Sequence, residues 1–219
     1  MNVQAFIDNI SFPMTLEELG RFADWFNVEE ILNVAETEWT APRWAVEGDI
    51  VFFFHAKTAI QKITMLETKL KQEKTEYSEE DYQWLWKSLQ RARELYKSYG
   101  GKIFAIGRVS GRTEYDSQEG DEVLHWASRF YAPINRIFVL QQPIDISEFR
   151  DFLPVSTRGA ITPVVGSDFD RLKKIICAKN EMPDYLKKSR AIPLPLQKIN
   201  PENWLEVTQE YRRLFALEI

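Results

Sequence analysis

The stretch GDIVFFFHA, residues 48–56, decides the fold. Its glycine and aspartate form a turn signal, and a run of β-branched and aromatic residues follows them. The run is too short for a typical helix and carries no polar face, so it predicts a strand buried on both sides. With 219 residues, 44% of them hydrophobic, the chain has enough apolar side chains to bury such a strand within one large domain.

Three more stretches have the texture of strands. Residues 102–109 (KIFAIGRV) alternate toward a polar turn, and residues 134–140 (INRIFVL) are rich in β-branched side chains. Residues 160–165 (AITPVV) form a further short strand, in which Pro163 has no N–H to donate. Pro163 therefore predicts an edge position or a bulge for that strand.

Helical spacing of apolar residues predicts the remaining elements. Residues 15–18 (TLEE) form a capping box that opens a first helix. Residues 58–99 form a helical hairpin by this spacing, in which Ser78 caps the second helix and a Gly-Gly pair ends it. Another helix begins at residue 167, and residues 200–219 form a last amphipathic helix.

These elements predict an α+β fold. We expect residues 1–219 to form one domain built on a small mixed or mostly antiparallel β-sheet or barrel. Residues 58–99 interrupt it as a helical hairpin insertion, and residues 200–219 pack on it as a C-terminal helix.

Composition excludes several classes of protein. No stretch approaches the ~20 apolar residues of a membrane span and the N-terminus lacks a leader pattern, which predicts a cytoplasmic protein without membrane contact. One cysteine and two histidines cannot supply a Cys-rich zinc site, and no phosphate loop or nucleophile motif occurs. We therefore expect no metal, no cofactor and no enzymatic activity. The one enzymatic alternative pairs His55 with Asp49 or Tyr131 as acid and base.

Charge is unevenly distributed along the chain. The first 50 residues hold two basic and ten acidic side chains within a total net charge of −5, so the rest carries about +3. A polyanionic partner would contact the later part of the chain, because phosphate contacts depend on the local density of Lys and Arg.

Five pieces of sequence occur in a recognisable order. They are residues 38–44 (EWTAPRW), 48–55, 102–109, 131–138 (YAPINRIF) and 158–163 (RGAITP), the last followed by Phe169. This order resembles the EVE domain, a family that belongs with the PUA-like barrels and is related to the YTH readers. The resemblance covers roughly residues 39–176 once the hairpin, which departs from the family pattern, is set aside. The family's first strand is hard to place in the N-terminal segment.

The resemblance implies a five- or six-stranded barrel whose pocket receives one modified base turned out of its strand. A flipped base loses stacking and recovers it between aromatic side chains, so such a pocket needs aromatic residues and few charges. Aromatic residues in the predicted loops and the histidine at the end of the buried strand are the candidates: Trp39, Trp44, His55, Trp126 and Tyr131. We expect Trp39 to form one face of the pocket. The alternatives are that a loop tryptophan caps the core and that His55 is a neutral buried side chain.

Arginines near the predicted strand ends are candidates for phosphate contacts. The group is Arg108, Arg112, Arg129, Arg136 and Arg158. Isolated arginines are otherwise solvated surface, which is the alternative for each of them.

Two hypotheses for function follow. In the first, the protein binds DNA or RNA that carries a modified base and acts as the specificity element of a defence or nucleic-acid-processing system whose catalytic subunit is another protein. In the second, the barrel is a scaffold and the hairpin of residues 58–99 docks a protein partner through an aromatic ridge of Tyr82, Trp86 and Tyr96.

Overall fold

A curled mixed β-sheet and a long helical hairpin make up the computed structural model, which describes residues 2–22, 27–115, 130–155 and 161–191. The sheet has the strand order β3-β7-β5-β4-β2-β8, and β6 pairs with β7 beyond this path. The bounds are β2 Ala5–Ile10, β3 Thr37–Thr40, β4 Ile50–His55, β5 Lys102–Val109, β6 Glu114–Tyr115, β7 Phe130–Asp145 and β8 Ile161–Val164. Only β2 and β4 pair in parallel within this sheet as described. Two short strands, β1 (Asn2–Val3) and β9 (Arg190–Ala191), form a separate parallel pair.

The structure confirms the strands predicted from local pattern. All six residues of β4 are buried, as the run of three phenylalanines indicates. Pro163 lies in β8, which is an edge strand, because an edge tolerates the missing donor. The correction concerns the N-terminal segment, where β2 forms a strand directly beside β4. Its sequence AFIDNI carries two polar residues on an otherwise buried strand, which obscures the pattern.

The predicted helices begin close to the expected residues, and the structure adds a short helix over Asp184–Lys187 that the sequence analysis does not predict. Their bounds are α1 Leu16–Phe22, α2 Asn27–Asn33, α3 Ala59–Gln72, α4 Glu79–Tyr99, α5 Gly166–Lys179 and α6 Asp184–Lys187. Thr15 Oγ1 accepts from the Glu18 N–H at 3.1 Å, and Ser78 Oγ accepts from the Asp81 N–H at 3.1 Å, so both predicted caps form. The left-handed residue that ends the hairpin is Gly101, with φ 72°. The helix predicted over residues 200–219 lies outside the described residues.

Each face of the sheet has its own apolar core. On one face α5 packs against the sheet, with the Phe169 ring 6.2 Å from that of Phe52. The end of α5 is fixed by the Asn180 side chain, which accepts from the Gln142 N–H at 2.9 Å and donates to the Gln142 carbonyl at 3.0 Å. The Asn180 amide thus pairs with the Gln142 backbone as a neighbouring strand residue would, and attaches α5 to β7.

The other face curls inward on itself. Thr40 in β3 donates a 2.6 Å hydrogen bond to Asp8 in β2, although β7, β5 and β4 lie between these strands in the sheet. Two edge-on aromatic contacts also cross the interior, from Trp39 to Phe53 at 5.7 Å and from Trp44 to Phe6 at 5.9 Å. The sheet is therefore a half-barrel whose two sides meet through side chains.

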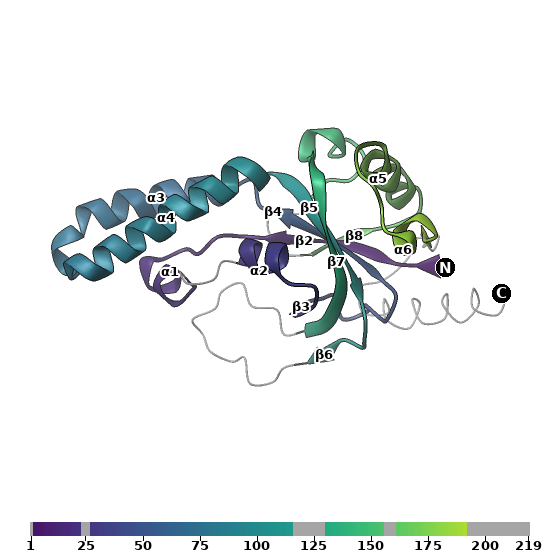
Figure 1. The fold of residues 1–219 in the computed structure, drawn as a ribbon, viewed down its shortest axis with the longest axis horizontal. Helices are drawn as coiled ribbons and strands as arrows, with labels where there is room; N and C mark the ends of the chain where they lie inside the picture. Colours follow the sequence, from purple (N-terminus) through teal and green to yellow (C-terminus); the bar gives the residue numbers. More distant parts are fainter. Residues whose placement is uncertain (1, 23–26, 116–129, 156–160, 192–219) are drawn as a thin grey trace.

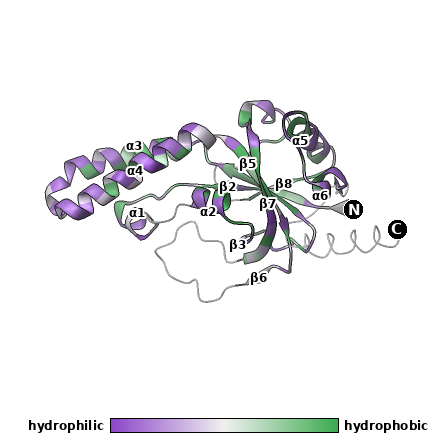
Figure 2. Ribbon diagram, in the orientation of Figure 1, coloured by the Kyte–Doolittle hydropathy of each residue, from purple (hydrophilic) through white to green (hydrophobic). Residues whose placement is uncertain are grey.

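The hairpin of α3 and α4 projects from one end of the half-barrel (Figure 1). It joins β4 to β5, which are antiparallel neighbours that a short turn could connect. Its two helices face each other through a third apolar core, which also includes Leu16 and Leu19 of α1. Figure 2 shows that most residues of the two helices are hydrophilic, with hydrophobic residues interspersed among them.

Candidate functional site

The predicted pocket residues separate onto two ends of the sheet. His55 is the last residue of β4, whereas Trp44 lies in the turn that precedes β4. Because β4 is six residues long and a strand rises about 3.3 Å per residue, its first and last residues lie roughly 17 Å apart. Tyr131 pairs with Thr40 of β3, at the same end as Trp44. His55 therefore does not share a pocket with Trp39, Trp44 and Tyr131.

The same separation removes the enzymatic alternative. Asp49 immediately precedes β4 and accepts from the Gln4 and Val46 N–H groups at 2.9 and 3.0 Å. An acid and a base must both reach the reacting atoms, and His55 lies a whole strand length away from Asp49. We call the end of the sheet where β4 begins the pocket end. We call the opposite end, where β4 stops at His55, the hairpin end.

Trp39 and Trp44 are core residues of the pocket end. Trp39 lies in β3 and not in the predicted loop, while Trp44 lies in the predicted turn. Their side chains are only 8% and 7% exposed. Trp39 Nε1 is buried without a hydrogen-bond partner in the described part of the chain. The two indoles thus support the pocket end from inside, in agreement with the alternative that a tryptophan caps the core.

A buried acid lies beneath Trp39. Burial raises the pKa of Asp8 to about 7, while the Thr40 hydroxyl and the Trp39 indole lower it by smaller amounts. The hydrogen bond to Asp8 that distance and angle support is that of Thr40. The half-barrel is therefore closed by a carboxyl group that titrates near neutral pH.

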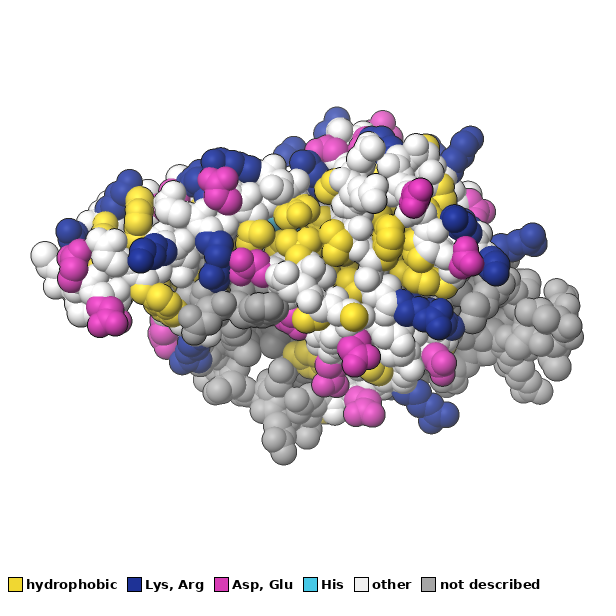
Figure 3. All heavy atoms as spheres, viewed as in Figure 1, with side chains coloured by type: hydrophobic (Ala, Val, Ile, Leu, Met, Phe, Trp, Pro, Cys, Tyr) yellow, Lys and Arg dark blue, Asp and Glu magenta, His cyan; other side chains and the backbone are white. Residues whose placement is uncertain are grey.

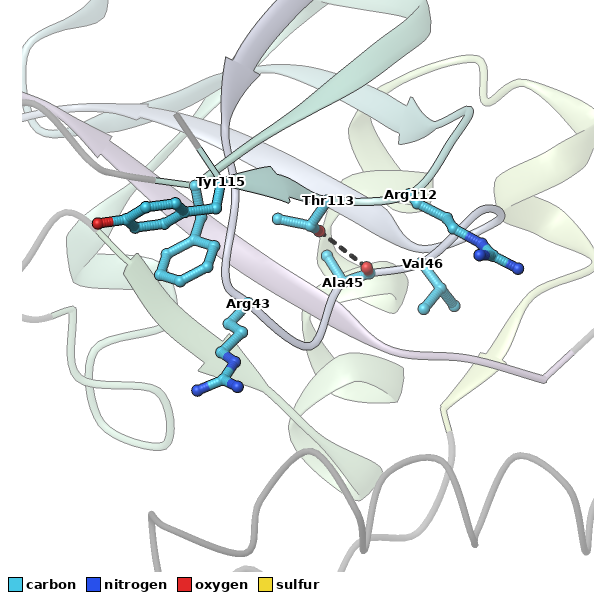
Figure 4. Close-up of a pocket in the computed structure, with 7 residues that line it drawn as sticks. Arg43, Ala45, Val46, Arg112, Thr113 and Tyr115 are labelled. Carbon is cyan, nitrogen blue, oxygen red and sulfur yellow. Dashed lines mark hydrogen bonds between the residues drawn. The ribbon is translucent and has the colours of Figure 1, made fainter. Parts of the chain in front are cut away.

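An open pocket of about 520 Å³ lies beside this core. Its lining comes from the turn before β4, from the segment that leads into β6, and from the start of β7: Arg43, Ala45, Val46, Arg112, Thr113, Tyr115 and Phe130. Thr113 Oγ1 donates to the Ala45 carbonyl at 2.9 Å, which ties the first two segments together. Figure 4 shows Tyr115 and Arg43 on one side of the pocket and Arg112 with Val46 on the other.

Aromatic and cationic groups share this pocket. The Tyr115 and Phe130 rings lie 5.3 Å apart and tilted by 56°, and the Tyr115 side chain is 53% exposed. Arg43 and Arg112 are exposed, and neither makes an ion pair with any described residue. Glu114 lies between Thr113 and Tyr115 in β6, so its side chain points to the opposite face. The pocket combines stacking surface with two guanidinium groups free to contact an anion.

The predicted arginines fall into two groups. Arg112 lines the pocket, and Arg108 lies half-buried near the end of β5 at the pocket end. Trp126, Arg129 and Arg158 lie outside the described residues. The sequence analysis does not single out Arg43, Tyr115 or Phe130, although Arg43 belongs to the EWTAPRW stretch and the two aromatic residues flank the segment with Trp126.

The hairpin end has a different character. His55 Nδ1 lies 3.3 Å from the Ile10 carbonyl, and burial lowers the pKa of His55 to about 4, so the imidazole is neutral. A smaller pocket of about 300 Å³ adjoins it, lined mainly by apolar groups of β4, α3 and the Ile146 turn. Figure 3 shows hydrophobic side chains gathered in this region, between the hairpin and α5.

Lysine side chains of the hairpin cover part of the predicted aromatic ridge. Lys74 lies over the Tyr82 ring and Lys71 over the Trp86 ring, each at 5.0 Å. The Tyr96 hydroxyl donates to the Lys57 carbonyl at 2.9 Å and thereby fixes the base of the hairpin. These three rings contribute to the hairpin's own structure.

Two further observations limit the chemistry of the described residues. None of their helices combines the length and apolar character that a membrane crossing requires. They also contain no group of three or more His, Cys, Asp or Glu side chains placed to hold a metal ion.

Comparison with solved structures finds a distant likeness. No family model and no curated protein matches the chain. A crystal structure of protein Atu2648 from Agrobacterium tumefaciens aligns over 83% of this chain and 100% of its own length, with 15% identity and a TM-score of 0.40. The strand order and the contact across the curl define the class of the fold: an α+β protein with a curled mixed sheet.

Proposed function

We propose that the protein is a non-enzymatic nucleic-acid-binding module that holds a modified base in the pocket of Arg43, Arg112, Tyr115 and Phe130. The observation that carries the proposal is the union, in one open pocket, of an aromatic pair and two guanidinium groups that make no ion pair with the described residues. Its volume of about 520 Å³ lies within the usual range for small-ligand sites.

The chemistry of the pocket fits a base together with its backbone. A base turned out of its strand recovers stacking on an aromatic face such as Tyr115, and the flanking phosphates attract Arg43 and Arg112. The resemblance to the EVE family and the inward curl of the sheet support a PUA-like barrel as the finer description of the fold. In this proposal Trp39 and Trp44 support the pocket from the core, and the base stacks on Tyr115 and Phe130.

The role in the cell belongs to the same proposal. A module that binds a modified base would act as the specificity element of a defence or nucleic-acid-processing system, with catalysis supplied by another protein. The proposal therefore requires that base recognition and phosphate contact are separable properties of this pocket.

A titration with matched oligonucleotides tests the proposal. Strands of DNA and RNA with 5-methylcytosine, 5-hydroxymethylcytosine or N6-methyladenine are compared with unmodified strands of the same sequence. We expect one modified strand to bind at least tenfold more tightly. Tyr115→Ala should weaken binding of that modified strand roughly ten- to a hundredfold, because stacking of one base contributes about 1–3 kcal/mol. Equal affinity for every strand of the panel would refute base recognition.

Charge variants separate the two properties. Arg43→Gln and Arg112→Gln should weaken binding to modified and unmodified strands alike and reduce the salt dependence of binding. Arg93→Gln in α4 is the matched control, because its guanidinium is already paired with Glu67. A loss of binding in the control equal to that in Arg112→Gln would show that the effect is one of total charge.

A second candidate function rests on the exposed apolar residues of the hairpin. Met65 is 47% and Trp84 is 37% exposed, which favours a protein partner at this surface. We expect the double variant Met65→Gln, Trp84→Gln to lose a co-purifying partner while it keeps full affinity for nucleic acid. Retention of the partner would exclude this surface.

A further inference from the structure

Arg136 has an unusual backbone. It is the sole non-glycine residue with a positive φ in the described ranges, at 51°. In this left-handed conformation the Cβ atom approaches the following carbonyl, which costs free energy for any residue other than glycine. Arg136 lies in β7 where the pairing with β5 shifts register between Ile106 and Arg108. The irregularity turns this part of β7 out of the regular ladder.

Tyr185 of α6 holds this irregularity in place. Its hydroxyl donates to the Arg136 carbonyl at 3.0 Å and lies 3.5 Å from the Ile106 carbonyl. The single hydroxyl therefore bridges β5 and β7 at the point where their register shifts. Lys173 of α5 fixes the C-terminal end of α6, because its Nζ donates to the Lys187 and Ser189 carbonyls at 2.7 Å each.

Arg108 and Arg136 lie on neighbouring strands beside Tyr185. Arg108 of β5 pairs with Asn135 of β7, the residue before Arg136. Burial raises the pKa of Tyr185 far above its ordinary value, and the charges of Arg136 and Arg108 lower it in part.

Among the described residues, neither guanidinium has a carboxylate partner. Within the described ranges, Arg108 and Arg136 take part in no ion pair, and Asp184, which precedes Tyr185, pairs with neither. Two neighbouring positive charges repel each other unless an anion lies between them. The planar forks of two guanidinium groups match the several oxygen atoms of a phosphate group.

We infer that Arg108 and Arg136 bind a phosphate group of the nucleic acid, with Tyr185 as the residue that positions Arg136. The inference rests on the proposed function, since it extends the path of the strand beyond the pocket of Arg43 and Arg112. Arg108 pairs with Ile50 at the start of β4 and precedes Arg112 by four residues, so both sites belong to the pocket end. A strained backbone at an exposed arginine is consistent with a role for its side chain.

Salt dependence of binding to an unmodified single strand tests the inference. Each lost phosphate contact should reduce the slope of log K against log salt concentration by roughly 0.7. We expect this reduction for Arg108→Gln and for Arg136→Gln, with the preference for a modified base unchanged. Arg171→Gln is the matched control and should keep the slope. Arg171 is an exposed arginine of α5, and its guanidinium stacks on the Phe152 ring. Unchanged slopes in both test variants would overturn the inference.

Two further variants separate binding from folding. Arg136→Gly removes the guanidinium and also relieves the strained φ, so it should keep or raise the melting temperature while it reduces the slope. Tyr185→Phe keeps the ring and every charge, and we expect it to reduce the slope as Arg136→Gln does. Combined with Arg136→Gln it should give no additional reduction, because both act through one contact. An additive reduction would contradict the positioning role of Tyr185.

Titration with inorganic phosphate and pyrophosphate distinguishes failure of this inference from failure of base recognition. If strands bind without base preference but the slopes fall as expected, base recognition fails and the phosphate site stands. If no strand binds, shifts of the Arg108 and Arg136 side-chain N–H resonances with pyrophosphate support a site for a free phosphate compound and overturn the assignment to a strand. Absence of both strand binding and resonance shifts overturns the phosphate site itself.

Discussion

The pocket end and the hairpin end use their positive charges differently. In the hairpin, four cationic side chains meet carboxylates and two lysines lie over aromatic rings. The ion pairs are Arg91 with Glu29, Arg93 with Glu67, Lys69 with Glu73 and Lys97 with Glu94. At the pocket end, Arg43, Arg108, Arg112 and Arg136 make no such pair with any residue that the structure describes. A paired charge stabilises its own fold, whereas an unpaired one at an aromatic pocket is available to a ligand.

The two ends also differ in their buried titratable groups. Asp8 lies inside the half-barrel of the pocket end and stays protonated up to about pH 7, whereas His55 at the hairpin end stays neutral down to about pH 4. Each group avoids carrying a charge in the core, but the two respond to pH in opposite directions. Variants at each end can therefore test the contrast separately.

The largest expected difference concerns tryptophan. Trp39→Ala should lower the free energy of unfolding by about 3–5 kcal/mol, because it leaves a cavity against Phe53 inside the half-barrel. Trp84→Ala in the hairpin should cost less than about 1 kcal/mol, because that side chain is 37% exposed. Urea unfolding of both variants measures the difference.

Binding data for Trp39→Ala sharpen this result. A core role predicts that affinity for modified and unmodified strands falls together with stability. If the protein keeps its stability but loses only the preference for a modified base, Trp39 belongs to the wall of the base pocket. Trp39→Phe keeps an aromatic contact to Phe53 and serves as the milder variant if Trp39→Ala does not fold.

Asp8 should give the next largest effect. Its pKa is raised in the folded state from 3.8 to about 7, so between these values the unfolded chain releases a proton that the folded protein keeps. Stability therefore falls as the pH rises from about 4 to about 7. Asp8→Asn can still accept from Thr40 and does not titrate, so its melting temperature should exceed that of the wild type by several degrees at pH 8. At pH 4 the two should melt within about a degree of each other.

Thermal melts from pH 4 to pH 8 test the Asp8 prediction. Thr40→Val is the control, because it removes the hydrogen bond at every pH and leaves the titrating group in place. A wild-type protein that is equally stable at pH 4 and pH 8, with Asp8→Asn showing the same flat profile, would contradict a buried protonated carboxyl group.

His55 should show a smaller effect of opposite sign. Its pKa is lowered from 6.5 to about 4. Between these pH values the unfolded chain binds a proton at His55 that the folded protein does not bind. Stability is lost as the pH falls through this window. His55→Asn keeps a donor for the Ile10 carbonyl and should show no such loss between pH 6.5 and pH 4. Comparing chemical unfolding at pH 7 and pH 4.5 measures it, and a steeper loss in the variant than in the wild type would contradict the assignment.

Local patterns in the sequence predict part of this architecture well. The GDIVFFFHA run, the hairpin of residues 58–99 and the edge position of Pro163 all follow from residue types within a few positions of one another. The strand β2 does not, because Asp8 and Asn9 interrupt its apolar run. Asp8 is compatible with that strand only because Thr40, 32 residues away, reaches it across the curl. Such a long-range contact leaves no local signal.

The candidate site illustrates the same limit. The prediction that His55 and Trp44 share a pocket is wrong because the six residues of β4 lie between them. The sequence already shows this separation. Arg43, Tyr115 and Phe130 come together only when the turn before β4, the segment leading into β6 and the start of β7 meet. No spacing between them in the chain indicates this, because the strand pairing and not the sequence distance determines which segments meet.

The smallest expected effect tests the charge contrast most directly. Arg93 Nη2 lies 2.5 Å from Glu67 Oε2, and Arg93 Nε donates to Glu67 Oε1 at 2.9 Å. The side chain of Arg93 is 30% exposed and that of Glu67 is 13% exposed. Arg93→Gln should therefore lower the free energy of unfolding by about 0.5–1 kcal/mol and leave strand affinity unchanged. Arg112→Gln should change stability by less than about 0.5 kcal/mol and weaken strand binding. A double-mutant cycle with Glu67→Gln isolates the pair, since removal of both partners should cost less than the sum of the single changes. If Arg112→Gln destabilises the fold as much as Arg93→Gln does, its guanidinium contributes to the structure, and the contrast between the two ends no longer supports a ligand at the pocket.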